Sequence, residues 1–181
     1  MELKSIVAVT QDWGIGAAGG MLCSLPEDMA FFRTQTKGAV VIMGRATLDS
    51  FPGGRPLKGR VNIVLTRDEA FEREGVTVVH TVAQALSAAA DAVVEKIAEG
   101  GCAPEVYVIG GEQVYRQLLP WCTTAWVTKM ETLVPADRFF PDLDAEDGWR
   151  LDGKGEELAS EKNGVKYRFC RYVNDKPLAV F

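Results

Sequence analysis

The sequence from residue 39 to residue 50 reads AVVIMGRATLDS. Residues 39–43 form a continuous apolar run, which predicts a buried β-strand. Residues 45–50 predict a short helix, and Gly44 between the two permits the tight turn that such a junction needs. A buried strand that leads directly into a helix is the repeating unit of a parallel sheet with helices on both faces.

The same alternation continues along the chain on both sides of this stretch. Further strands are predicted over residues 5–10, 60–66, 76–80, 105–109 and 126–130, and further helices over residues 26–36, 82–98 and 112–119. Near the end, Asn163-Gly164 separates residues 158–162 from residues 165–169, which predicts a hairpin with a two-residue turn. We therefore expect one α/β domain over residues 1–181, with a central, mostly parallel eight-stranded sheet, a C-terminal antiparallel hairpin and helices on both faces.

Composition narrows the classes of function. The 181 residues suit one domain, and 20 Lys plus Arg against 25 Asp plus Glu give a net charge of −5, which disfavours nucleic acid and anionic membranes as partners. No apolar run approaches the roughly 18 residues that span a bilayer, and no signal peptide is apparent. The four cysteines are scattered and His80 is the single histidine, which disfavours a disulfide framework or a metal centre. We expect a cytoplasmic monomer.

An acidic residue beside two aromatic rings opens the helix predicted over residues 26–36. Asp28 lies in its first turn, and Phe31 and Phe32 follow it at positions i+3 and i+4 on one face. A carboxylate between apolar walls can hold a flat polar heterocycle, and burial would raise its pKa. Acids are also common at helix starts without any such role, and taken alone this pattern favours that simpler interpretation.

Three turns that follow predicted strands could hold the phosphates of a ligand. Gly44-Arg45, Thr66-Arg67 and Gly110-Gly111 offer backbone N–H groups, positive charge or both. Neither glycine turn matches the common nucleotide motifs, and tight turns need glycine anyway. Three such turns on one small sheet nevertheless favour a dinucleotide. The glycine-rich loop over residues 12–21 is either a mobile lid or a plain connection.

Taken together, these segments resemble the dihydrofolate reductase family over essentially the whole chain. The resemblance implies NADPH-dependent reduction of 7,8-dihydrofolate to 5,6,7,8-tetrahydrofolate in one-carbon metabolism, and it makes antifolate inhibitors expected ligands. The landmarks that carry it, in order, are Gly14-Ile15-Gly16, Met21, residues 25–28, Phe32, residues 41–45, residues 54–57, residues 59–66, residues 108–111, Val114-Tyr115, Thr128 and residues 140–142.

On the substrate side, the resemblance implies three catalytic residues, Asp28, Thr128 and Tyr115. Asp28 would bind the 2-amino group and N3–H of the pterin and favour protonation of N5 by way of water. Thr128 would hydrogen-bond Asp28 and orient it, and Arg60 would clamp the α-carboxylate of the glutamate tail. The walls around the pterin and aminobenzoyl rings would be Ile6, Val7, Phe32, Phe51, Leu57 and Ile109.

On the cofactor side, the resemblance implies that NADPH lies along the glycine turns. Ala8, Ile15 and Tyr115 would border the nicotinamide, and residues 16–21, from Gly16 to Met21, would close over it. Gly110-Gly111 matches the family's unusual cis Gly-Gly bond. The phosphates would contact Gly44, Arg45, Ala46 and Thr47, and the 2′-phosphate Arg45, Thr66 and Arg67. Further cofactor contacts would come from Leu65, Ile109, Glu112, Gln113 and Val114.

Three departures from the family pattern stand out. Cys23 occupies the place of a tryptophan in many bacterial members, which alters water and proton delivery near the pterin. Ala46 and Gln113 replace polar or basic residues on the cofactor side, so the preference for NADPH over NADH is less secure. Residues 91–103 are longer than in compact bacterial members and predict an extended helix and turn on the surface.

Two other functions remain open from the sequence. One is a reductase of the same fold that acts on a ribosylated pyrimidine or another pterin, although Asp28, Phe32 and Arg60 together favour a folate. The other is a binding protein that has lost turnover. The cysteine at position 23 gives that possibility some support, whereas Asp28, Tyr115 and Thr128 oppose it.

Overall fold

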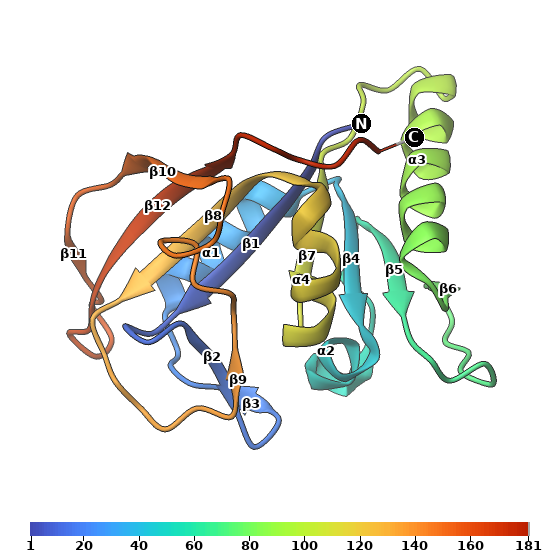
Figure 1. Cartoon of the computed structure of the whole chain (residues 1–181). Helices are drawn as coiled ribbons and strands as arrows, with labels where there is room; N and C mark the ends of the chain where they lie inside the picture. Colours follow the sequence, from blue (N-terminus) through green and yellow to red (C-terminus); the bar gives the residue numbers. More distant parts are fainter. Residues whose placement is uncertain (181) are drawn as a thin grey trace.

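The apolar strands of the sequence assemble into one large sheet (Figure 1). The computed structural model describes residues 1–180, so the predicted domain boundary at Phe181 lies outside the described residues. Within them, the strand order is β10-β12-β8-β1-β7-β4-β5-β6, and β11 pairs with β12. These strands are β1 (Leu3–Val9), β4 (Val40–Gly44), β5 (Val61–Leu65), β6 (Thr77–Val79), β7 (Val106–Gly110), β8 (Cys122–Met130), β10 (Trp149–Lys154), β11 (Leu158–Ala159) and β12 (Lys166–Asn174).

The pairing of these strands is mostly parallel, as the sequence predicts. Strands β8, β1, β7, β4, β5 and β6 run parallel to one another, whereas β12 is antiparallel to β8, β10 and β11. The predicted class, an α/β fold with an antiparallel C-terminal end, is confirmed. Within residues 1–180 the large sheet has nine strands and not the predicted eight, because the short β11 pairs with β12 beside the main order.

Helices cover both faces of the sheet because the strands are apolar on both sides. Val40 and Ile42 of β4 pack in the cluster beneath α3 and α4, and the alternate residues Val41 and Met43 pack in the cluster that α1 and α2 cover. The helices and short 3-10 turns are α1 (Pro26–Thr36), α2 (Arg45–Ser50), η1 (Pro52–Gly54), α3 (Val82–Ala98), α4 (Glu112–Leu118) and η2 (Leu119–Trp121).

A second, small sheet contains most of the glycine-rich loop. It joins β3 (Gly20–Met21), β2 (Gly14–Ala17) and β9 (Arg138–Phe139) in that order. The sequence does not predict these strands, because they are short and lack an alternating apolar pattern. Strand β10 was missed for a similar reason, since its residues are largely exposed.

The predicted two-residue hairpin turn is wrong. Ser160 N donates to Val165 O and Gly164 N donates to Ser160 O, so residues 161–164 form a longer loop. A type I′ turn needs positive φ at both central residues, but only Gly164 has it, at 72°. The side chain of Asn163 instead bonds outward, from Nδ2 to Ser24 O at 3.1 Å, and its Oδ1 accepts from Val165 N.

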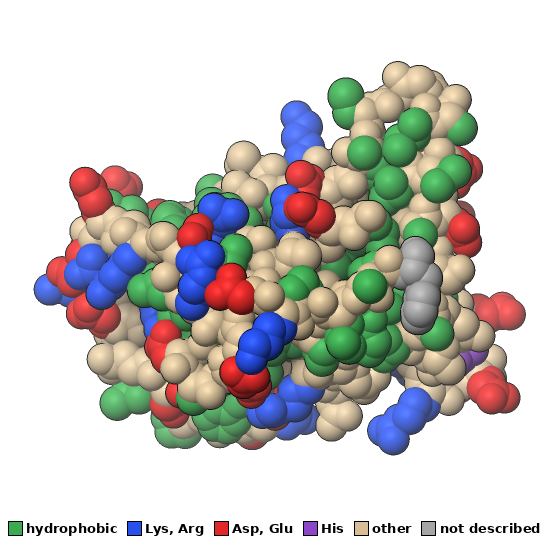
Figure 2. Space-filling view, turned by 45° about the horizontal axis from the view of Figure 1, so that its top comes forward, with side chains coloured by type: hydrophobic (Ala, Val, Ile, Leu, Met, Phe, Trp, Pro, Cys, Tyr) green, Lys and Arg blue, Asp and Glu red, His purple; other side chains and the backbone are tan. Residues whose placement is uncertain are grey.

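The surface carries charges of both signs in close alternation. Figure 2 shows blue and red side chains intermingled on one face of the molecule. Ion pairs such as Arg150–Asp175 and Lys176–Asp147, each at 3.0 Å, account for part of this pattern. Within residues 1–180, no helix combines the length and apolar character required to cross a bilayer.

Candidate active site

The carboxyl group of Asp28 lies at the start of α1 and faces β8. Thr128 of β8, which is 2% exposed, donates a hydrogen bond from Oγ1 to Asp28 Oδ1 at 2.6 Å. Burial raises the pKa of Asp28, and the hydrogen bond from Thr128 partly opposes that rise because it stabilises the charged form. The geometry thus holds one carboxyl in a fixed orientation, with a pKa moved toward neutrality.

The neighbouring carboxyl, Glu27, is bound by the protein itself. Its Oε1 accepts from Glu161 N at 2.9 Å and its Oε2 accepts from Ser160 Oγ at 3.0 Å. Backbone N–H groups, of Glu27 itself and of Glu161, lower the pKa of Glu27. The two adjacent acids therefore differ in role: Glu27 anchors the start of α1 to the loop between β11 and β12, whereas Asp28 has its pKa raised. The sequence gives no local signal of this anchor, because the partners are more than 130 residues apart in the chain.

Five of the six residues expected around the substrate rings share one face of the sheet. Val7 is the exception, because successive residues of a strand point to opposite faces, and its side chain packs beneath α3 and α4. The five others, which belong to the cluster on the α1 and α2 face or pack against it, are Ile6, Phe32, Phe51, Leu57 and Ile109.

Arg60 precedes β5 and lies beside the last turn of α1. Its Nε donates to Thr36 O at 3.1 Å, and its Cζ lies 5.9 Å from the centroid of the Phe32 ring. Burial, together with the charge of Arg33, lowers the pKa of Arg60. Arg60 lines a groove of about 590 Å³ together with the rest of residues 53–60, Asn62 and residues 73–75. Within residues 1–180 the guanidinium has no carboxylate partner, so its Nη groups are available to an anion.

The two glycine turns interlock at the carboxyl ends of β4 and β7. A Cβ at Gly44 would lie 3.1 Å from Val114 Cγ2, and one at Gly110, whose φ is 129°, would lie 3.2 Å from Thr47 Oγ1. The Gly110-Gly111 peptide bond is cis. A side chain at either glycine would thus crowd a neighbouring side chain, and both positions present only backbone atoms. These residues fit a dinucleotide cradle.

Tyr115 of α4 is buried, and its hydroxyl donates to Ile6 O at 2.7 Å. Burial is the largest cause that raises the pKa of this hydroxyl. Because its proton is used in that bond, Tyr115 links α4 to β1 and does not present a donor to a ligand. Ile15 packs against the same cluster as Tyr115, whereas Ala8 packs against a separate small cluster with Leu25.

The loop over residues 14–21 is held at one side by the segment around β9. Asp137 N donates to Gly16 O at 3.0 Å, and Ala18 N donates to Asp137 Oδ2 at 2.9 Å. Met21 at the other side is 63% exposed. The expected lid is therefore a short sheet with one anchored side and one exposed tip.

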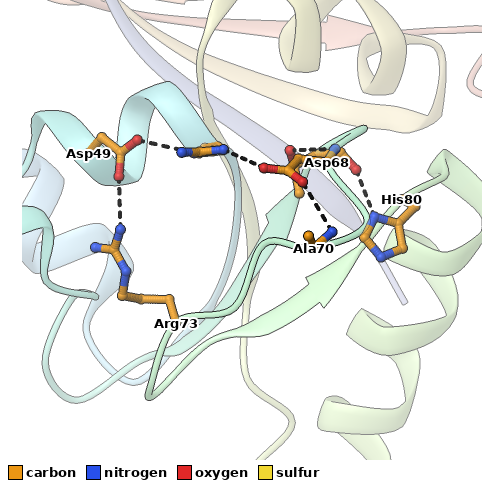
Figure 3. Close-up of polar contacts among 7 residues, drawn as sticks. Asp49, Asp68, Ala70, Arg73 and His80 are labelled. Carbon is orange, nitrogen blue, oxygen red and sulfur yellow. Dashed lines mark hydrogen bonds and ion pairs between the residues drawn. The ribbon is translucent and has the colours of Figure 1, made fainter.

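The residues expected at the 2′-phosphate follow two neighbouring strands. Arg45 follows β4, and Thr66 and Arg67 follow β5, whose last residue is the buried Leu65. Arg45 is not free, because its guanidinium forms ion pairs with both Asp49 and Asp68. These two acids are labelled in Figure 3. Neither acid is predicted from the sequence as a partner of Arg45. Glu112, at the start of α4, is also engaged, since it accepts from Arg116 Nε at 3.2 Å.

Comparison with known proteins agrees with this geometry. A model of the dihydrofolate reductase family matches residues 2–174. The chain belongs to the dihydrofolate reductase family. It is 35% identical over 173 residues to the dihydrofolate reductase of Neisseria gonorrhoeae, covering 96% of this chain and 98% of that one. It is 41% identical over 162 residues to that of Mycobacterium leprae, covering 87% and 89%.

A solved structure extends the likeness to three dimensions. The dihydrofolate reductase from Enterococcus faecalis, complexed with NADP(H) and RAB-propyl, superposes with a TM-score of 0.77 at 30% identity, covering 96% of each chain. The resemblance identified from the sequence landmarks is therefore confirmed, and the chain is an oxidoreductase of this family.

The structure shows where the residues lie that depart from the dihydrofolate reductase pattern. Cys23 is half-buried against the small cluster of Leu25 and Phe169, and its Sγ accepts from Asn163 Nδ2 at 3.7 Å. Ala46 and Gln113 are both exposed, beside the two glycine turns. The helix α3 ends at Ala98 and a surface turn follows, with Gly100 at a φ of 84°.

Proposed function

We propose that this chain catalyses the NADPH-dependent reduction of 7,8-dihydrofolate to 5,6,7,8-tetrahydrofolate, with hydride added at pterin C6 and a proton at N5. The observation that supports this most is the order of groups along α1. Asp28 lies at its start, Phe32 one turn later, and Thr36, whose carbonyl binds Arg60, at its end. The eight helical steps from Asp28 to Thr36 rise about 12 Å, which suits a substrate with a polar heterocycle at one end and a carboxylate at the other.

At the heterocyclic end, Asp28 would accept hydrogen bonds from the 2-amino group and N3–H of the pterin. Burial raises the pKa of Asp28 toward the range where a group can both hold and release a proton. Thr128 keeps the carboxyl in one orientation through the 2.6 Å bond. Phe32, Ile6 and Ile109 would exclude water from the ring faces.

At the other end, Arg60 would bind the α-carboxylate of the glutamate tail. Its Nε is already used by Thr36 O, which fixes the plane of the guanidinium. The Nη groups would then form a two-pronged contact with a carboxylate. Burial lowers the pKa of Arg60, yet an arginine remains charged at neutral pH, so the clamp persists throughout the working range.

On the opposite side of the site, Gly44 with residues 45–47 and Gly110-Gly111 would hold NADPH, and Arg45 and Arg67 would contact its phosphates. When bound, NADPH supplies the hydride. The interlocked glycine turns support this assignment, because a Cβ at either position would crowd a neighbouring side chain. Ile15 would close over the nicotinamide with the loop that Asp137 anchors.

We infer that the ligands are dihydrofolate and antifolate inhibitors, and that the protein works as a monomer in the cytoplasm without nucleic acid or membrane. The alternation of charges on the surface supports this inference, since it offers no broad patch of one sign on the face drawn in Figure 2.

The test is the loss of nicotinamide absorbance when pure protein is mixed with NADPH and one of three acceptors. We expect turnover with dihydrofolate, a much higher KM with dihydropterin, which lacks the tail that Arg60 would bind, and none with a ribosylated aminopyrimidine. Turnover with the pyrimidine alone would favour a related reductase. Binding without turnover in a folded protein would favour a binding protein, and Cys23→Trp would then be the first change to make.

A further inference from the structure

Arg45 is neutralised by the protein's own carboxylates. Its Nη1 lies 2.7 Å from Asp68 Oδ2 and its Nε lies 3.4 Å from Asp49 Oδ2. Asp49 is in turn 3.2 Å from Arg73 Nη2 (Figure 3). The guanidinium carbon of Arg45 also lies 4.7 Å from the centroid of the Phe71 ring. This chain of two acids and two bases therefore has no net charge.

Hydrogen bonds within its own loop hold the side chain of Asp68 in position beside Arg45. Ala70 N donates to Asp68 Oδ1 at 3.0 Å, and Asp68 N donates to Thr66 Oγ1 at 3.2 Å. One carboxylate oxygen is thus occupied by the backbone, and the other, Oδ2, faces Arg45. The turn after β5 holds the carboxylate ready against this arginine.

The place of this pair is where a dinucleotide's adenosine end is expected. In parallel sheets ligands bind beyond the carboxyl ends of the strands, and Arg45 and Asp68 follow the carboxyl ends of the neighbouring strands β4 and β5. NADPH and NADH differ by the 2′-phosphate alone. Arginine favours that phosphate, whereas an acid at the ribose favours the free hydroxyl.

We propose that Asp68 is a specificity-determining residue of the cofactor site, whose carboxylate competes with the 2′-phosphate for Arg45 and so reduces the preference for NADPH over NADH. This inference rests on the proposed use of NADPH. Arg67 is exposed and, within residues 1–180, has no ion-pair partner, so it supplies the remaining positive charge. NADPH still binds, because it must only displace a carboxylate from an arginine.

The exposure of the pair sets the size of the effect. The side chains of Arg45 and Asp68 are 46% and 45% exposed, so water screens their attraction. An exposed ion pair changes an equilibrium by up to about fivefold, and removal of a like charge beside a phosphate adds to this. We expect the loss of the Asp68 charge to tighten NADPH binding by about three- to tenfold.

The decisive variant is Asp68→Asn, which keeps an oxygen for Ala70 N and removes only the charge. Dissociation constants would be measured by titration for NADPH, NADH, 2′-phospho-ADP-ribose and ADP-ribose. We expect the two ligands with a 2′-phosphate to bind about three- to tenfold more tightly, and the two without it to change by less than twofold. Asp68→Ser, whose hydroxyl can also accept from Ala70 N, should act in the same direction.

Asp147→Asn is the matched control, because it removes the same charge from an exposed pair with Lys176 before β10. It should change NADPH binding by less than twofold. Two outcomes would overturn this inference and leave the proposed function intact, provided that the wild type binds NADPH normally. One is no tighter NADPH binding in Asp68→Asn, and the other is an equal tightening of NADPH and NADH binding. A folded wild type that binds no NADPH overturns the proposed function as well.

Discussion

Replacing Thr128 with valine removes the hydroxyl that donates to Asp28 Oδ1 at 2.6 Å, without a large change in volume. A hydrogen bond to a charged group contributes about 1.5 to 3 kcal/mol. Thr128 is 2% exposed, so a water molecule cannot easily take the place of the lost hydroxyl as a donor to Asp28. Because 1.36 kcal/mol corresponds to one pKa unit, the pKa of Asp28 should rise by about one to two units. Burial alone, the larger cause of the existing shift, would then act unopposed.

The assay is the pH dependence of kcat/KM for dihydrofolate with saturating NADPH. We expect the limb that reports Asp28 to move to higher pH by about one to two units in Thr128→Val, and to return in Thr128→Ser, which restores the hydroxyl. Thr124→Val makes the same chemical change at another buried position of β8 and should leave the profile in place. A Thr128→Val profile that superposes on the wild type, or moves to lower pH, would refute the reasoning.

Three further outcomes are expected. Asp28→Asn should abolish most turnover at neutral pH and recover part of it in acid. Burial raises the pKa of Asp28 above its ordinary 3.8, so the wild type loses stability as the pH rises from that value through the raised pKa of the folded protein. The variant should therefore have a higher Tm than the wild type at pH 7, and the difference should vanish at low pH. Arg60→Ala should raise the KM for dihydrofolate by about ten- to a hundredfold and leave that for NADPH within twofold, and equal effects would exclude the clamp. Tyr172→Phe removes a buried hydroxyl that donates to Asp144 Oδ1 at 2.7 Å and should lower the Tm by about 3 to 10 °C in calorimetry, whereas an unchanged Tm would show that the bond adds nothing.

The strongly patterned elements could be predicted from the sequence. The helix over residues 82–98 is found at the same bounds, with Thr81 and Gln84 forming a capping box at its start. Strands buried on both faces are long apolar runs, and such runs are a local signal. The strands that were not predicted are β2, β3, β9 and β10. They are short or exposed and so lack a local apolar pattern, and their pairing depends on partner strands elsewhere in the chain.

The candidate site divides in the same way. The order of Asp28, Phe32 and Arg60 along the site could be anticipated from the landmarks. Ile6 and Val7 were both expected at the substrate, but their side chains lie on opposite faces of the sheet because side chains alternate along a strand. Interactions across long sequence separations were not foreseeable. The bond from Ser160 to Glu27 and the pairing of Asp68 with Arg45 both depend on the folded arrangement of loops.

The most direct test of the central claim is to follow a label from the cofactor into the product. NADPH carrying deuterium at the transferable position of nicotinamide C4 would be incubated with the protein and 7,8-dihydrofolate, and the product examined by NMR and mass spectrometry. The account predicts tetrahydrofolate with one deuterium, bound at C6. Unlabelled product, or deuterium at any other carbon, would contradict it.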